Sequence, residues 1–167
     1  MSATTSTPIH PVLSNRRSPR SFDATATISN EALVAILEAA RWAPSANNFQ
    51  PWRFHVFVED GLSSLSSFLG TSYLKITPKE LQNDMKLAKL IRRPLLASAV
   101  VAVSMKRQKE SKILEIEEIE AVACAIQNMH LSCTAYGLGG FWSTPKLIYS
   151  SEMNDFLELE EIDKWQM

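Results

Sequence analysis

Cysteine and glycine are both scarce in this sequence, with two cysteines and five glycines among 167 residues. Cys124 and Cys133 fall in one segment of helical periodicity, so about 13 Å would separate them along the helix axis. That distance is too long for a disulfide between them. The composition therefore excludes a disulfide scaffold and fits reduced thiols, which predicts a cytoplasmic location.

Long apolar runs and a dominant charge are missing as well. No run approaches the roughly 18 apolar residues that span a bilayer, and the start of the chain lacks the apolar core of a secretory signal. The net charge of -1 gives no support to a nucleic-acid partner. His10, His55 and His130 are scattered without metal-ligand spacing, so no metal site is predicted. A P-loop and a hydrolase GxSxG motif are absent too.

The remaining pattern predicts one α+β domain over residues 11–167, preceded by a flexible tail at residues 1–10. Ser29 is typical of a helix N-cap, an apolar stripe follows it, and Pro44 ends that helix. The other expected elements are a strand at 53–58, a short helix at 62–69, a connector at 70–77, a helix at 78–91, a buried central strand at 95–104 and a long helix at 113–136.

Three arginines stand within five residues, at Arg16, Arg17 and Arg20, with Ser18 between them. A guanidinium binds a phosphate group through two parallel N–H donors, and a serine hydroxyl can add another hydrogen bond. The cluster is thus a candidate phosphate clamp. Taken alone, it also fits a solvated basic turn, and that alternative stays open.

A polar loop follows the first helix and has a proline near each end, which fixes the backbone on either side. Its hydroxyl and amide groups could bind the alternating C=O and N–H groups at the edge of a flat ring. An Asx-rich turn between a helix and a strand is the alternative. The polar members of the loop are Ser45, Asn47, Asn48 and Gln50.

A third segment, residues 137–145, carries three of the five glycines and then Trp142, Ser143 and Thr144. Glycines let a backbone approach a flat ring closely, and free N–H groups could face it. The segment is not a dinucleotide-binding fingerprint, because it lacks the GxGxxG spacing in a βαβ setting. A glycine-rich end of a helix is the alternative.

The order and spacing of these segments resemble the nitroreductase family of flavoproteins, over roughly residues 12 to 164 and closest to its small single-domain branch. The motifs that carry the resemblance are Arg16-Arg17-Ser18-x-Arg20-x-Phe22, Ala43-Pro44-Ser45, Asn48-x-Gln50-Pro51-Trp52, Arg93-Pro94-Leu95, Ala125-x-Gln127-Asn128-Met129 and Gly137-Leu138-Gly139-Gly140-x-Trp142.

The resemblance implies a nitroreductase-like mixed, mostly antiparallel sheet flanked by helices, and a homodimer with FMN at its interface. It implies an oxidoreductase that passes hydride from NADH or NADPH to a small electron-poor acceptor, such as a nitroaromatic or a quinone, by a ping-pong mechanism. No side chain is expected to be catalytic, because the flavin carries the chemistry. The FMN-binding residues that the resemblance implies are Arg16, Arg17, Ser18, Arg20, Trp42, Ser45, Ala46, Asn47, Asn48, Gln50, Trp142, Ser143 and Thr144.

In the family, the segment that matches Glu161-Ile162-Asp163-Lys164 runs on into another apolar strand and a tail that packs on the partner, whereas this sequence stops at Met167. We therefore expect the last C-terminal strand to be missing and the dimer to be weakened. A degenerate or truncated flavin-binding protein without turnover is one alternative function. A flavin-dependent dehalogenase or fragmentase is another, but the connector at 70–77 leaves little room for the inserted lid that those enzymes carry.

Overall fold

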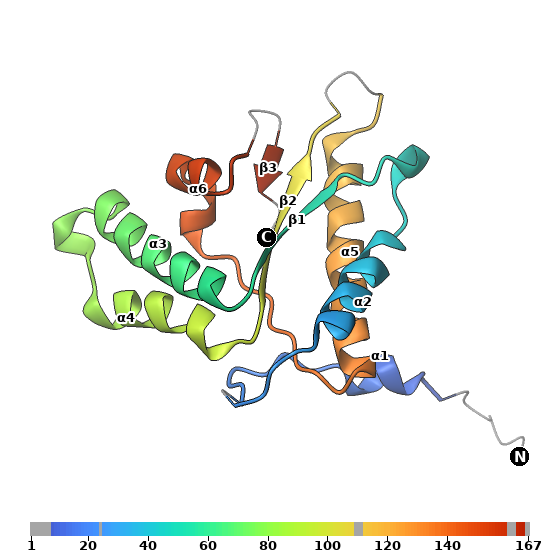
Figure 1. Cartoon of the computed structure of the whole chain (residues 1–167). Coiled ribbons are helices and arrows are strands. Elements are labelled where there is room, and N and C mark those ends of the chain that lie inside the picture. Colours follow the sequence, from blue (N-terminus) through green and yellow to red (C-terminus); the bar gives the residue numbers. More distant parts are fainter. Residues whose placement is uncertain (1–7, 24, 109–111, 160–162, 166–167) are drawn as a thin grey trace, which may run out of the picture.

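A computed structural model describes residues 8–23, 25–108, 112–159 and 163–165 of the chain (Figure 1). The helices are α1 (Pro11–Asn15), α2 (Asn30–Arg41), α3 (Asp60–Ile76), α4 (Asp84–Arg92), α5 (Glu115–Ala135) and α6 (Ser151–Phe156). The strands are β1 (Trp52–Phe57), β2 (Val100–Lys106) and β3 (Asp163–Trp165). The predicted α+β class is confirmed, with helices predominating. Most of the predicted N-terminal tail, residues 1–7, lies outside the described residues.

The three described strands form one sheet in the order β1-β2-β3, and both pairs are antiparallel. Trp52 of β1 pairs with Met105 of β2, and Ser104 of β2 pairs with Trp165 of β3. The strand predicted at 53–58 is β1, and the predicted central strand is β2, which lies between its two neighbours.

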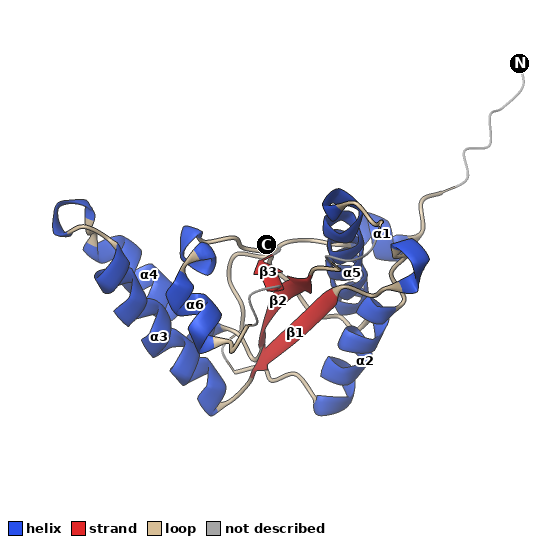
Figure 2. Cartoon of the chain, turned by 90° about the horizontal axis from the view of Figure 1, so that it is seen from above, coloured by secondary structure: helices blue, strands red, loops and turns tan. Residues whose placement is uncertain are grey.

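Two apolar cores lie on opposite faces of the sheet, because successive side chains of a strand point to opposite sides. Val103 and Met105 of β2 face α2 and α5, where Val122 and Ala125 are fully buried. Val100 and Ala102 face the other way and pack on the core beside α3 and α6. Figure 2 shows the sheet in the middle, with α2 and α5 on one side and α3, α4 and α6 on the other.

Helix α2 confirms the most local of the sequence predictions. The Ser29 hydroxyl accepts a hydrogen bond from the Ala32 N–H at 3.1 Å, which satisfies a free donor of the first turn. Leu33, Ile36 and Ala40 are its buried stripe. The helix ends at Arg41, before Pro44, and the polar loop then connects α2 to β1.

Three sequence predictions about the middle of the chain are wrong. The helix expected at 78–91 begins only at Asp84, because Lys79–Leu81 form a separate 3-10 turn and Asn83 caps α4. The expected connector at 70–77 is helical, because α3 continues to Ile76. Gly70 lies inside this helix at a close approach to α4, where an added Cβ would lie 2.9 Å from Ile91 Cγ1. The strand expected from residue 95 begins only at Val100, since Pro94–Leu96 form a 3-10 turn closed by the Ala97 N–H on the Pro94 carbonyl at 3.2 Å.

None of the helices in the described part of the chain has both the length and the apolar character of a membrane span.

Candidate functional site

The arginine segment follows directly after α1, a five-residue helix that begins at Pro11. Arg16 Nη1 donates a hydrogen bond to Ser18 Oγ at 3.1 Å, and Arg17 Nη1 donates to the Ser14 carbonyl at 2.7 Å. Arg17 and Arg20 are exposed and Arg16 is half-buried. The predicted clamp thus keeps guanidinium donors open to solvent, with Arg16 and Arg17 oriented by bonds to neighbouring residues.

The glycine segment begins where α5 ends. Gly137 adopts a positive φ of 69°, the left-handed geometry that closes a helix, and the Leu138 N–H donates to the Cys133 carbonyl at 2.8 Å. A Cβ added to Gly139 would lie only 2.6 Å from Pro19 Cγ, and Phe22 is in van der Waals range of the same point. The arginine segment is therefore packed directly on the glycine turn, across more than a hundred residues of sequence.

His130 packs against this turn, although it was not among the residues predicted to bind the cofactor. A Cβ on Gly140 would lie 3.1 Å from His130 Nδ1, and the Trp142 ring is 6.4 Å from the imidazole, inclined by 28°. Burial lowers the pKa of His130, and the positive charge of Arg16 lowers it further. The imidazole is thus neutral at pH 7, and its Nδ1 is buried without a hydrogen-bond partner among the described residues.

The polar loop adopts backbone geometry that non-glycine residues rarely accept. Asn47, Asn48 and Gln50 have positive φ angles of 50°, 57° and 48°. Asn tolerates this region, whereas for most residues it costs on the order of 1–3 kcal/mol. Ser45 Oγ accepts from the Gln50 N–H at 3.2 Å, and Gln50 Nε2 donates to Asn48 Oδ1 at 3.0 Å. The loop is therefore held in a strained shape, which is common at binding sites.

A buried ion pair lies between α5 and the polar loop, and its acidic member, Glu118, is a second residue that the sequence did not indicate. Glu118 of α5 is 2% exposed and pairs with Arg107, while its Oε1 accepts from the Gln108 N–H at 2.9 Å. The neighbouring Lys106 N–H donates to the Pro51 carbonyl at 2.8 Å. The segment after β2 thus joins the end of the loop to the beginning of α5.

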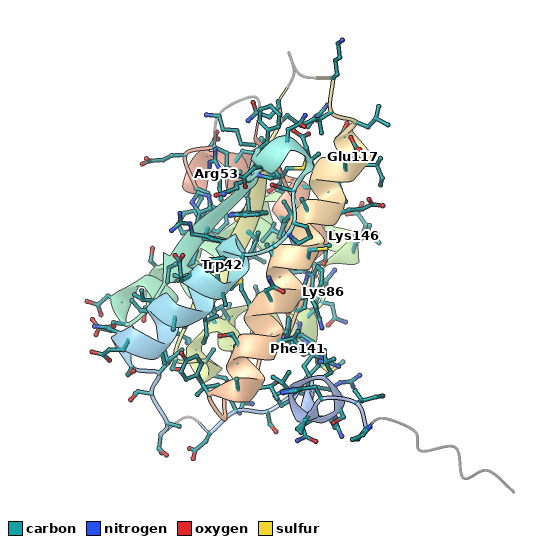
Figure 3. All side chains as sticks on the ribbon, turned by 90° about the vertical axis from the view of Figure 1, so that its right-hand side faces the viewer. Trp42, Arg53, Lys86, Glu117, Phe141 and Lys146 are labelled. Atoms are coloured by element: carbon teal, nitrogen blue, oxygen red, sulfur yellow. The ribbon has the colours of Figure 1, made fainter. Side chains whose placement is uncertain are left out.

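The structure brings only some of the predicted residues together within one chain. The loop packs on α5 near Ala121, whereas the arginine segment and Trp142 gather around His130, about 13 Å further along the helix axis. Figure 3 shows the same separation, with Glu117 near one end of α5 and Phe141 near the other. Ser143 and Thr144 follow Trp142 and are exposed.

A shallow apolar groove of about 360 Å³ lies beside α1, on the face formed by α2 and α5. Trp42, at the end of α2, stands at this groove and is 81% exposed, which is far more than is usual for a large aromatic side chain. The groove is lined by Val12, Ala39, Trp42, Asn128, Leu131, Ser132 and Ala135.

Two further predictions concern cysteine and metal chemistry. Cys124 and Cys133 are both free thiols, as expected from their spacing, and burial raises the pKa of Cys133. No cluster of three His, Cys, Asp or Glu side chains suited to a metal ion occurs within the described residues.

The fold defined by these elements is that of nitroreductase-like proteins. A nitroreductase-like family protein from Bacillus cereus superposes with a TM-score of 0.81 at 25% identity, covering 98% of this chain and 84% of its own. A "putative nitroreductase" from Desulfovibrio desulfuricans, solved in complex with FMN, gives a TM-score of 0.71 at 27% identity over 95% of this chain and 83% of that one.

The sequence leads to the same family. The model of the nitroreductase family matches residues 13–167, so the chain belongs to this family of FMN-dependent oxidoreductases. The "putative NAD(P)H nitroreductase YdjA" of Escherichia coli strain K12 is 28% identical over 153 residues, which cover 92% of this chain and 81% of the relative.

Proposed function

We propose that the protein binds FMN and passes hydride from NADH or NADPH to a small electron-poor acceptor, such as a nitroaromatic or a quinone. The two substrates would use one open site in turn, in a ping-pong reaction. The observation that carries the proposal is the packing of Pro19 and Phe22 on Gly139, which gathers the arginine cluster and the Trp142 turn at one place. The FMN in the Desulfovibrio desulfuricans structure and the name of the Escherichia coli relative support it.

The residues gathered around the glycine turn fit the chemistry of a flavin phosphate. Exposed guanidinium groups on Arg17 and Arg20, beside Arg16, supply the paired donors that a phosphate needs. Pro19 and His130 pack closely against Gly139 and Gly140, and the neutral His130 offers a buried nitrogen that lacks a partner among the described residues. Bound FMN would supply the reversible two-electron chemistry, so the chain needs to bind, orient and shield rather than to act as acid or base.

Each predicted residue then has a role in holding the cofactor. Arg16, Arg17, Ser18 and Arg20 would bind the phosphate and ribityl chain, while Trp142, Ser143 and Thr144 would lie along the ring system. The strained loop would bind the ring edge through its amide groups. Its predicted contacts are Ser45, Ala46, Asn47, Asn48 and Gln50, with Trp42 nearby.

We further propose that the working unit is a homodimer with FMN at the interface. Within one chain the loop and the arginine segment lie about 13 Å apart along α5, with the apolar groove and the exposed Trp42 on the same face. A second copy related by a two-fold axis could cover this face and present its own loop to the arginine segment. The expected weakening of the dimer stays a prediction, which light scattering at several concentrations would test.

The test of the cofactor begins with the purified protein, which should be yellow and should bleach when NAD(P)H is added without air. A protein that stays colourless after incubation with FMN would contradict the proposal. A yellow protein that NAD(P)H leaves unchanged would instead favour the flavin-binding alternative without turnover.

Arg16→Ala provides a residue-specific test. It should weaken FMN binding by about 1.5–3 kcal/mol, because a hydrogen bond to a charged group is removed. Lys79→Ala is the matched control, since Lys79 is an exposed cation on the α3–α4 hairpin, outside the proposed clamp. FMN affinity is measured by fluorescence quenching of the free flavin, and equal affinities for the two variants would remove Arg16 from the clamp.

A further inference from the structure

The only charged side chain that is buried in the described part of the chain lies beside the polar loop. Glu118 is 2% exposed, and the other buried polar residues there are serines. A buried ion pair is weak evidence of stability, because well-packed apolar residues of similar size are often as stable or more so. In some proteins such a pair instead fixes a single geometry. The burial of Glu118 therefore points to a role in geometry.

The loop packs on the part of α5 that carries this carboxylate. Glu118 and Ala121 line a small gap whose other wall is the loop, at Ser45, Ala46 and Phe49. Figure 3 shows the loop beside the same end of α5, and the two segments are in contact. The place of the loop on the molecule is thus set next to the ion pair.

Hydrogen bonds connect the ion pair to the end of the loop. The Glu118 carboxylate pairs with Arg107 and accepts from the Gln108 N–H at 2.9 Å. The Lys106 N–H donates to the carbonyl of Pro51, the residue that follows the loop, at 2.8 Å. The short segment after β2 is therefore bonded to α5 at one end and to the loop at the other, so a shift of this segment would move the loop.

The bonds inside the loop have a different effect. Gln50 donates to Ser45 through its backbone N–H and to Asn48 through its side chain, so these bonds set the shape of the loop rather than its place on α5. The side chains of Asn47 and Asn48 are exposed. The direction in which their amide groups point therefore depends on what anchors the loop to the rest of the chain.

We propose that Glu118, together with Arg107, is a positioning residue of the flavin site. The pair holds the polar loop at the place on α5 from which its amide groups reach the edge of the FMN ring. The inference rests on the proposed function and adds two residues that act on FMN through the loop. Hydrogen bonds weaken steeply when donor and acceptor are misaligned, so a displacement of about 1 Å is enough to lower FMN affinity.

The main test compares Glu118→Gln with Val122→Ala, which also destabilises α5 but leaves the ion pair intact. FMN dissociation constants are measured by fluorescence quenching without urea, where both variants are expected to be folded. Glu118→Gln should raise the constant about tenfold, by analogy with groups that orient the ligands of metal sites. Val122→Ala should leave it unchanged, as should Glu120→Gln, which removes an exposed charge from the same helix. An equal change in Glu118→Gln and Val122→Ala, or none in Glu118→Gln, would overturn the proposal.

The double variant Arg107→Met with Glu118→Met separates positioning from stability. It should unfold near the wild-type urea midpoint, because no charge remains buried without a partner. Its FMN dissociation constant should nevertheless stay raised, because the Gln108 N–H has lost the acceptor that ties its segment to α5. Recovery of wild-type FMN affinity along with stability would show that the pair is only structural, and would overturn the proposal.

Hydrogen exchange in the FMN-free protein separates this proposal from the cofactor proposal, because it needs no flavin. The Gln50 and Lys106 N–H groups should exchange faster in the double variant than in the wild type, while the Ala125 N–H in the middle of α5 should not. If the wild type binds no FMN, the cofactor proposal fails, and the exchange alone decides whether the pair anchors the loop. Unchanged exchange at Gln50 and Lys106 would overturn the positioning role even if FMN binds.

Discussion

Removing the charge of Glu118 is expected to destabilise the protein more than any surface substitution on the same helix. The carboxylate is 2% exposed and pairs with Arg107, whose side chain is 16% exposed. Taking one partner from a buried ion pair leaves the other charge uncompensated, which costs about 3–5 kcal/mol. Glu118→Gln keeps an oxygen that can accept from the Gln108 N–H, and Arg107 retains some access to water. We therefore expect a loss of about 3 kcal/mol, the lower end of that range.

Urea denaturation with an unchanged m-value measures this loss directly as a shift in midpoint. Glu120→Gln is the matched control, because Glu120 is exposed on the same helix and should change stability by no more than about 0.5 kcal/mol. Replacing both partners, Arg107→Met with Glu118→Met, should recover most of the loss, since no unpaired charge then remains buried. If Glu118→Gln and Glu120→Gln unfold within about 1 kcal/mol of each other, the ion pair does not support the loop as argued.

Other predictions concern the strained loop, the buried imidazole and the core. The free energy of unfolding of Asn47→Ala should be about 1 kcal/mol lower than that of Asn47→Gly, because both variants lack the amide but only alanine is strained at a φ of 50°. Equal urea midpoints for the two variants would show that the loop relaxes at no cost. The pKa of His130 lies below its ordinary 6.5, so in mildly acidic solution the unfolded state binds more protons than the folded state, and the free energy of unfolding should fall as the pH drops below about 6.5. In urea titrations at several pH values, His130→Asn should make the free energy of unfolding depend less on pH. An unchanged pH dependence would mean that other groups cause it. Val122→Ala, at a fully buried position, should lower the free energy of unfolding by about 2 kcal/mol, because two methyl groups are lost and a cavity remains. A decrease below about 0.5 kcal/mol would show that the core closes around the shorter side chain.

The fold could be predicted from the sequence where the determining interactions are local. The Ser29 cap and the apolar stripe after it lie within one helix, so the pattern alone was sufficient to place α2. The connector expected at 70–77 is wrong because the reason for a glycine at position 70 is the close approach of Ile91, which is distant in sequence. The start of β2 was misplaced for a related reason, since the apolar composition of a 3-10 turn does not differ from that of a strand.

The candidate site was predictable as a set of segments but not as an arrangement. Glycines after a long helix and clustered arginines can be read directly, yet nothing local indicates that Pro19 packs on Gly139. Glu118 lies in an acidic run at the start of α5 that resembles a solvated face. Only the fold reveals Arg107 opposite it. Positive φ is common for Asn, which suits Asn47, but no sequence rule predicts it for Gln50.

The strain in the loop and the ion pair beneath it bear on how a complete site would form. Backbone strain persists only where the surroundings fix it, and three contacts within the chain help to fix this loop: Ser45 to Gln50, Gln50 to Asn48, and Lys106 to Pro51. Because these contacts need no partner, we expect the exposed amide groups of Asn47 and Asn48 to be ordered in the single chain, so association would cost little further ordering. If the loop does contact FMN from a second copy, FMN affinity should rise with protein concentration until the dimer is fully formed. An affinity independent of concentration, measured below and above the dimer dissociation constant, would mean that one chain completes the site by itself.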